Sequence, residues 1–74
     1  MKFTIVIEKT PNNYASYVPD LPGCVATGST REELLEEIRE AIEFHIEGMR
    51  QDGESIPNPQ ATSDIVEVSA VAGT

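Results

Sequence analysis

The sequence has few of the residues on which most enzyme and metal chemistry depends. It contains one cysteine, Cys24, and one histidine, His45, so neither an internal disulfide nor a zinc site of the common kinds can form. Five Lys and Arg residues stand against 13 Asp and Glu residues, a formal net charge of −8. Nucleic-acid binding draws its affinity from basic side chains that neutralise phosphates, so this balance argues against direct contact with DNA or RNA.

Long apolar runs are also missing. No segment approaches the roughly 18–20 consecutive apolar residues of a membrane span. The first apolar run, within MKFTIVIEK, is too short for a signal sequence and is interrupted by a glutamate. A lone thiol is typical of a reducing compartment, so the sequence predicts a cytoplasmic protein without membrane contact.

A chain of 74 residues is expected to form one small domain over residues 1–74. A single core of this size seldom supplies more than about 3–5 kcal/mol of stability. Since disulfide and metal staples are absent, self-association or complex formation is the remaining source of stability. An acidic surface suits a basic protein partner, although solubility alone explains the charge as well.

Residue alternation predicts three strands at the start of the chain, at Lys2–Glu8, Tyr14–Val18 and Cys24–Thr27. Their short connections favour antiparallel pairing. Pro22-Gly23 fits a type II turn, because proline presets φ at the first corner and glycine allows a positive φ at the second. Gly28 is expected to end the third strand.

A long helix is predicted next. Thr30 is a good N-cap, and Glu33 three residues later completes a capping box. The helix is expected to run to about residues 51–52, with Gly53 as the residue that follows its C-cap. Gly48 within the helix costs up to about 1 kcal/mol against alanine. Either a close backbone contact explains that glycine, or it is a weak point.

The predicted helix is apolar on one side and acidic on the other. The apolar stripe, expected to cover the sheet, comprises Leu34, Leu35, Ile38, Ala41, Ile42, Ile46 and Met49. The acidic face comprises Glu32, Glu36, Glu40, Glu43 and Glu47. These glutamates stand three or four residues apart and repel one another. A solvated helix surface explains them, and the functional interpretation is electrostatic steering of a basic partner.

The last predicted strand is Ile65–Val71, in which apolar and polar residues alternate. A right-handed crossover would place it parallel to the first strand, giving a β-β-β-α-β, α+β fold with sheet order 3-2-1-4 and the helix on one face. This predicted edge strand carries one charge and lacks the Lys or Pro residues that usually prevent an edge strand from pairing with another chain. We therefore predict that it pairs with a second copy or another protein, in a homo-dimer or tetramer, through Ile65, Val66, Val68 and Ala70.

The whole pattern resembles the HicB family of bacterial antitoxins. The resemblance covers about Lys2 to Pro59 and is carried by Tyr14–Val18, Asp20-Leu21-Pro22-Gly23-Cys24, Gly28, Thr30, Glu33, Ala41 and Ile42. It implies a truncated ribonuclease-H-like fold and a partner, the small mRNA-degrading toxin HicA, that the antitoxin binds and masks. Many members also carry a C-terminal DNA-binding segment. Only three residues follow Val71, so no such domain and no operator binding are expected here. The alternative is a stand-alone homo-oligomer without a toxin.

The ribonuclease-H likeness raises a metal-dependent nuclease as a further alternative. That chemistry needs several carboxylates converging on divalent cations, yet the middle of the first strand holds Thr4, Ile5 and Val6. Cys24 and His45 are the candidates for nucleophile and base, but a small buried hydrophobe and a locally bonded helix residue explain them better. We expect no catalytic residue, metal or cofactor. Acids considered for a metal cluster are Glu8, Glu33, Glu37, Asp64 and Glu67.

Asp20 and Leu21 lie in the turn before Pro22-Gly23. In the structural interpretation, the carboxylate of Asp20 caps nearby backbone N–H groups. In the functional interpretation, Asp20 and Leu21 form a rigid knob that a partner recognises. The predicted partner-binding residues are Asp20, Leu21, Glu36, Glu40, Glu43 and Glu47.

Overall fold

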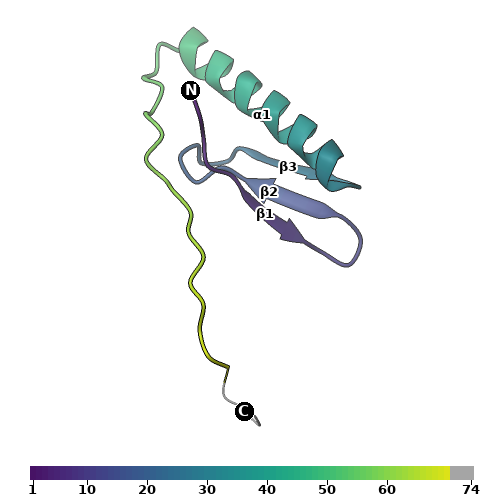
Figure 1. Ribbon diagram of the computed structural model, residues 1–74. Helices are drawn as coiled ribbons and strands as arrows, with labels where there is room; N and C mark the ends of the chain where they lie inside the picture. The colour runs from purple at the N-terminus through teal and green to yellow at the C-terminus, as the bar shows by residue number, and fades with distance from the viewer. Residues whose placement is uncertain (71–74) are drawn as a thin grey trace.

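The computed structural model describes residues 1–70, which form a three-stranded sheet, one helix and an extended C-terminal segment (Figure 1). The strands are β1 (Val6–Lys9), β2 (Tyr14–Tyr17) and β3 (Val25–Gly28), and the helix is α1 (Arg31–Gln51). The sheet order is β1-β2-β3, and both strand pairs are antiparallel. The predicted α+β class and three-stranded meander are confirmed.

β1 is shorter than the strand predicted at Lys2–Glu8. Its ladder runs from the pair Val6–Tyr17 to the pair Lys9–Tyr14, so the four residues of β2 set its length. Residues 1–5 instead form a separate segment that leads from the C-terminal half of α1 to the sheet (Figure 1).

Two consecutive turns connect β2 to β3. The backbone N–H of Leu21 donates to the carbonyl of Val18, and the N–H of Cys24 donates to the carbonyl of Leu21, both at 3.0 Å. Gly23 has a φ of +85°, which the second corner of a type II turn requires. These turns fold Leu21 into the core, where its side chain is 1% exposed.

The helix begins and ends where the sequence predicts. The Oγ1 atom of Thr30 accepts the backbone N–H of Glu33 at 3.1 Å. At the other end, Gly53 has a φ of +73°, and the N–H of Glu54 donates to the carbonyl of Met49 at 2.9 Å. That bond closes a Schellman motif, which satisfies a carbonyl at the helix end.

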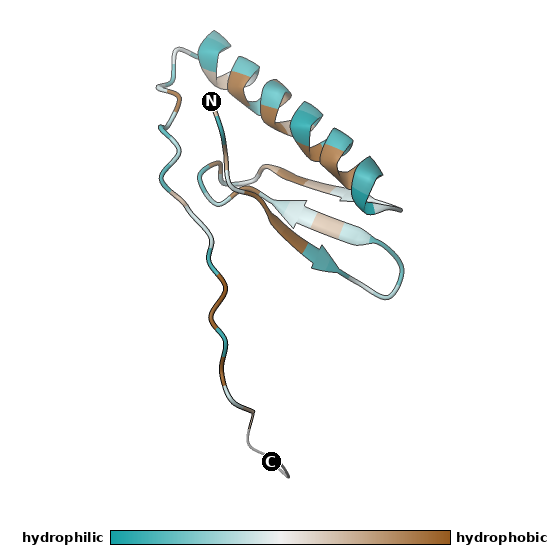
Figure 2. Cartoon of the chain, in the orientation of Figure 1, coloured by the Kyte–Doolittle hydropathy of each residue, from teal (hydrophilic) through white to brown (hydrophobic). Residues whose placement is uncertain are grey.

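α1 packs on β3 and β2, with its apolar side toward the sheet and its hydrophilic side outward (Figure 2). Leu34 and Ile38 are its buried residues. Gly28 lies so close to the helix start that a Cβ atom there would stand 2.6 Å from the backbone nitrogen of Leu34. The core cluster contains Val18, Leu21, Cys24 and Ile38, with Phe3, Ile5, Ala26, Ala41, Ile42, Ile46 and Met49 packed against it.

The fourth strand predicted at Ile65–Val71 does not form within this chain. Residues 54–70 contain no strand, and Val71 lies outside the described residues. Asp20 holds residues 60–61, and the chain then runs away from the sheet (Figure 1). The predicted order 3-2-1-4 is therefore corrected to β1-β2-β3 for a single chain. The segment's large apolar side chains are exposed: Ile65 (93%), Val66 (81%) and Val68 (77%).

Candidate functional site

The outer surface of α1 carries the acidic face, and all five of its glutamates are exposed. Phe44 lies on the same side of the helix and is 83% exposed. It follows Glu40 by four residues and precedes Glu47 by three, so these side chains are neighbours on the helix surface. Sequence reasoning missed Phe44. The sequence signal that could have identified Phe44 is its position outside the apolar stripe of the helix.

Little basic charge offsets the acidic face. Glu47 pairs with Arg50 at 3.5 Å between Oε2 and Nη1, and both side chains are mostly exposed. Exposed pairs of this kind contribute little to stability. The outer surface of α1 thus combines carboxylates, of which Glu47 alone has an ion-pair partner within the described residues, with one large apolar side chain.

The sheet face opposite α1 carries a second apolar patch that sequence reasoning also missed. Val6, Tyr17 and Val25 lie side by side across the three strands. Because successive side chains of a strand alternate between faces, this row points away from the buried Ser16 and Val18. Tyr17 is 44% exposed and Val25 is 63% exposed. The sequence did contain a signal for this patch, because apolar residues occupy the alternating strand positions that are expected to face water.

Asp20 ties the C-terminal segment to the rest of the fold. Its Oδ2 atom accepts the backbone N–H of Gln60 at 3.2 Å and that of Ala61 at 3.0 Å. On the other side, the Oγ1 atom of Thr4 donates to the carbonyl of Ala61 at 2.7 Å. The carboxylate caps backbone N–H groups, as the structural interpretation expects, but these lie 40 and 41 residues away rather than in the turn.

Leu21, the neighbour of Asp20, is not at the surface. Its side chain belongs to the core cluster with Val18 and Cys24. The two residues predicted to form one knob therefore have separate roles: Leu21 fills the core, and Asp20 holds the C-terminal segment.

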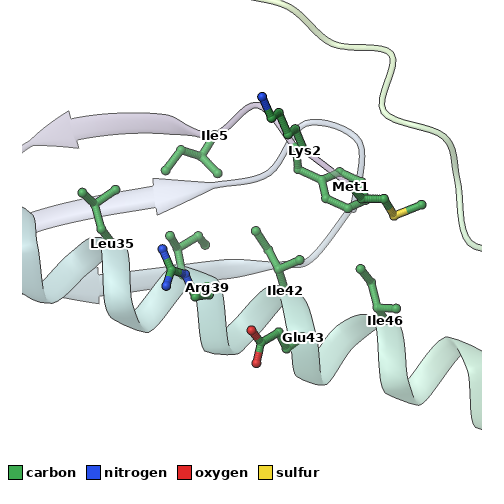
Figure 3. Close-up of a pocket in the computed structure, with 10 residues that line it drawn as sticks. Met1, Lys2, Ile5, Leu35, Arg39, Ile42, Glu43 and Ile46 are labelled. Carbon is green, nitrogen blue, oxygen red and sulfur yellow. The ribbon is translucent and has the colours of Figure 1, made fainter.

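An open groove of about 670 Å³ lies between the N-terminal segment and α1 (Figure 3). α1 packs on β3 and β2, and this groove lies on the β1 side of the helix. Its charged lining residues are Lys2, Arg39 and Glu43. The remaining lining residues are apolar: Met1, Phe3, Ile5, Leu35, Ile38, Ile42 and Ile46.

The residues considered for catalysis are not arranged as a reactive site. Cys24 is buried, and this burial raises the pKa of its thiol, whereas a nucleophilic cysteine needs a lowered pKa. His45 is half-buried on α1. Within residues 1–70, no three His, Cys, Asp or Glu side chains gather in a way that could hold a metal ion. The acids considered for a nuclease centre are thus not brought together.

No helix within the described residues is both long enough and apolar enough to cross a membrane.

Known proteins resemble this chain in sequence and in fold. An uncharacterised 14.9 kDa protein of Haemophilus phage HP1 is 47% identical over 57 residues, which cover 77% of this chain and 43% of the phage protein. A UPF0150 protein of Thermoplasma acidophilum is 42% identical over 62 residues, 82% of this chain and 90% of that protein. A UPF0150 protein of Archaeoglobus fulgidus is 46% identical over 59 residues, 76% of this chain and 86% of that protein.

A chain in the solved structure of the HicA3 and HicB3 toxin-antitoxin complex superposes with a TM-score of 0.69 and 32% sequence identity. The match covers 80% of this chain and 70% of that one. The family model for the HicB-like antitoxin of bacterial toxin-antitoxin systems matches residues 3–74. The meander, the capped helix and these matches agree: the chain belongs to the HicB-like antitoxin family.

Proposed function

We propose that this chain binds and masks a small basic toxin of the mRNA-cleaving HicA kind, and that it does so through the outer surface of α1. The observation that carries the proposal is the 32% identity, at a TM-score of 0.69, to a chain from a toxin-antitoxin complex. The exposed acidic face supports it, because a basic partner is the complement of a chain with a net charge of −8.

In this proposal the carboxylates and Phe44 act at different stages. The carboxylates attract the basic toxin over distances comparable with the Debye length, about 8 Å at physiological salt, and so raise the association rate. Phe44 then supplies a large side chain that loses its water in the complex, as aromatic residues at interface centres do. Masking requires only that the toxin surface is covered, so no catalytic residue is invoked.

Three further features belong to this proposal. The domain has a truncated ribonuclease-H-like fold, the chain and its toxin act in the cytoplasm, and this chain does not contact nucleic acid directly. Of the predicted partner-binding residues, the glutamates remain in the proposed surface. Leu21 does not, because it is buried, and Asp20 contributes only by holding the C-terminal segment.

The test is binding to the small basic protein encoded beside the gene of this chain, with inhibition of RNA cleavage as a second readout. Charge reversal at Glu36, Glu40 and Glu47 should slow association about tenfold or more at low salt, and the difference should shrink as salt is added. The matched control reverses Glu8, Glu33 and Glu54, which are exposed but lie outside the acidic face. Equal losses in both triple variants, or none in the first, would contradict the proposed surface.

The second candidate function is a stand-alone homo-oligomer without a toxin. The exposed apolar side chains of the C-terminal segment favour it. Failure of the neighbouring protein to bind at modest salt, together with a defined oligomer in sedimentation, would select this alternative.

A further inference from the structure

Residues 62–70, which we name the C-terminal arm, extend from the domain without covering any of it. Every residue of the arm is exposed. The radius of gyration is 15.5 Å, whereas a compact chain of this length has about 11 Å. Figure 2 shows strongly apolar residues within the arm, and Figure 1 shows how far it runs from the sheet. An arm with alternating apolar residues and no partner within its own chain is suited to pairing with another one.

The anchor at Ala61 limits how much of the arm can pair with its own β1. Ala61 is bonded to Thr4, just before β1 begins. If the arm ran parallel to β1 from that point, equal rises per residue would place Ile65 beside Glu8. Val68 would then lie beyond Lys9, where β1 ends. In its own chain, residues 63–66 of the arm could therefore face β1, whereas Val68 and Ala70 could not.

The groove beside α1 is the complement of the arm. Seven of its ten lining residues are apolar, and it lies next to β1, whose outer edge has no strand partner within the described residues. Lys2 and Arg39 line it, two of the five basic residues in the chain, against one acid, Glu43. The chain has no basic residue after Arg50, and the charged residues of the arm are Asp64 and Glu67. Its apolar pattern and its charge thus fit the groove.

We propose that two copies of this chain exchange their C-terminal arms, each arm adding a fourth strand to the outer edge of β1 in the other copy. Val66 and Val68 share one face of the arm and would cover the groove between the N-terminal segment and α1. The exchange would be reciprocal and closed, as in a two-fold dimer with a swapped segment. It also pairs the free edge of β1, which would otherwise template aggregation.

This inference can be tested separately from toxin binding, because Glu43 is the one member of the acidic face that lines the groove, and it is not among the residues reversed in the toxin-binding test. It names the second copy as the occupant of the groove. A parallel course from Ala61 would lead the arm from Thr4 toward Lys9, away from Met1, Lys2 and Phe3, which line the groove in its own chain. The arm residues are exposed in the single chain, so their substitution leaves the core contacts intact.

The first experiment is disulfide trapping between two variants of different size, Lys2→Cys and Val68→Cys. The native Cys24 is buried and does not compete. After mixing and mild oxidation, we expect a cross-linked heterodimer between the two variants. Glu47→Cys in place of Val68→Cys is the matched control, since this residue is also exposed, and it should not cross-link to Lys2→Cys. A chain carrying Lys2→Cys and Val68→Cys together that links only to itself would overturn the exchange.

The second experiment measures the molecular mass in sedimentation. The unmodified chain should be dimeric, and the double variant Val66→Asp/Val68→Asp should raise the dissociation constant of the dimer about tenfold or more, with an unchanged far-UV spectrum. Phe44→Asp is the matched control: it also charges an exposed apolar residue, and it should leave the mass unchanged. A folded monomer of the unmodified chain, or a dimer that Phe44→Asp dissociates while the arm variant does not, would overturn the proposal.

Discussion

Asp20 and Ala61 are joined by a hydrogen bond across 41 positions of the chain. The carboxylate Oδ2 accepts the backbone N–H of Ala61 at 3.0 Å, and the carbonyl of the same residue accepts the hydroxyl of Thr4 at 2.7 Å. One residue of the C-terminal segment is therefore held from both sides. This anchor decides where the segment leaves the domain, and thus which surfaces it can reach.

Asp20→Ala should release the segment without unfolding the domain. Hydrogen bonds to a charged group contribute about 1.5–3 kcal/mol, so the amide exchange of Gln60 and Ala61 should accelerate about tenfold or more. Asp20→Asn is the control, because it keeps one acceptor oxygen and should show a smaller effect. Unchanged exchange at both amides in Asp20→Ala would contradict the role of the anchor.

Two glycine substitutions should have opposite effects on stability. In Gly28→Ala the new Cβ would stand 2.6 Å from the nitrogen of Leu34, so the helix must shift, and the free energy of unfolding should fall by about 1–3 kcal/mol. In Gly48→Ala nothing lies within 4 Å of the new atom. Since glycine is a poor helix former, that variant should gain up to about 1 kcal/mol. Urea denaturation measures both, and the same sign for both would be inconsistent with this packing.

Thr30→Ala should weaken the start of α1. The substitution removes the oxygen that accepts the N–H of Glu33 at 3.1 Å, and losses of N-caps typically cost about 1 kcal/mol. Thr30→Ser keeps the acceptor and should stay close to the original stability. Thermal unfolding of the three proteins is sufficient, and a serine variant as unstable as the alanine variant would argue against capping.

The thiol of Cys24 should react slowly in the folded protein. Burial leaves it 4% exposed and raises its pKa, so less thiolate is present at any given pH than in a free cysteine. The unfolded thiol ionises first as the pH rises. The free energy of unfolding should therefore decrease from the ordinary thiol pKa upward, until the native thiol ionises as well. Labelling with a thiol reagent with and without urea checks the first claim, and rapid labelling of the folded chain would contradict it.

Much of the fold could be predicted from the sequence because its signals act over a few residues. Pro22-Gly23 specifies its turn through backbone geometry alone, and Gly23 has the required positive φ. Thr30 caps the helix by accepting the backbone N–H of Glu33, which is only three residues away in the sequence. The acidic face follows from a period of 3.6 residues and needs no knowledge of the sheet.

Other features depend on residues far apart in the chain. The sequence predicted a role for Asp20 in its own turn, whereas its partners are 40 and 41 residues away. Residues 65–70 have the alternation of a strand, but a strand forms only where another edge is within reach. The same limit applies to Phe44, Tyr17 and Val25, whose exposure became clear only once the covered faces were known.

By itself the sequence determined the meander, the turn, the helix with both of its ends and the separation of apolar from acidic side chains. Tertiary structure alone decided the length of β1, the burial of Leu21, the anchor at Ala61 and the exposure of the C-terminal arm. The physical reason is the range of the interactions. Backbone geometry and local hydrogen bonds are complete within one or two turns of chain, whereas packing and strand pairing depend on which distant surfaces meet.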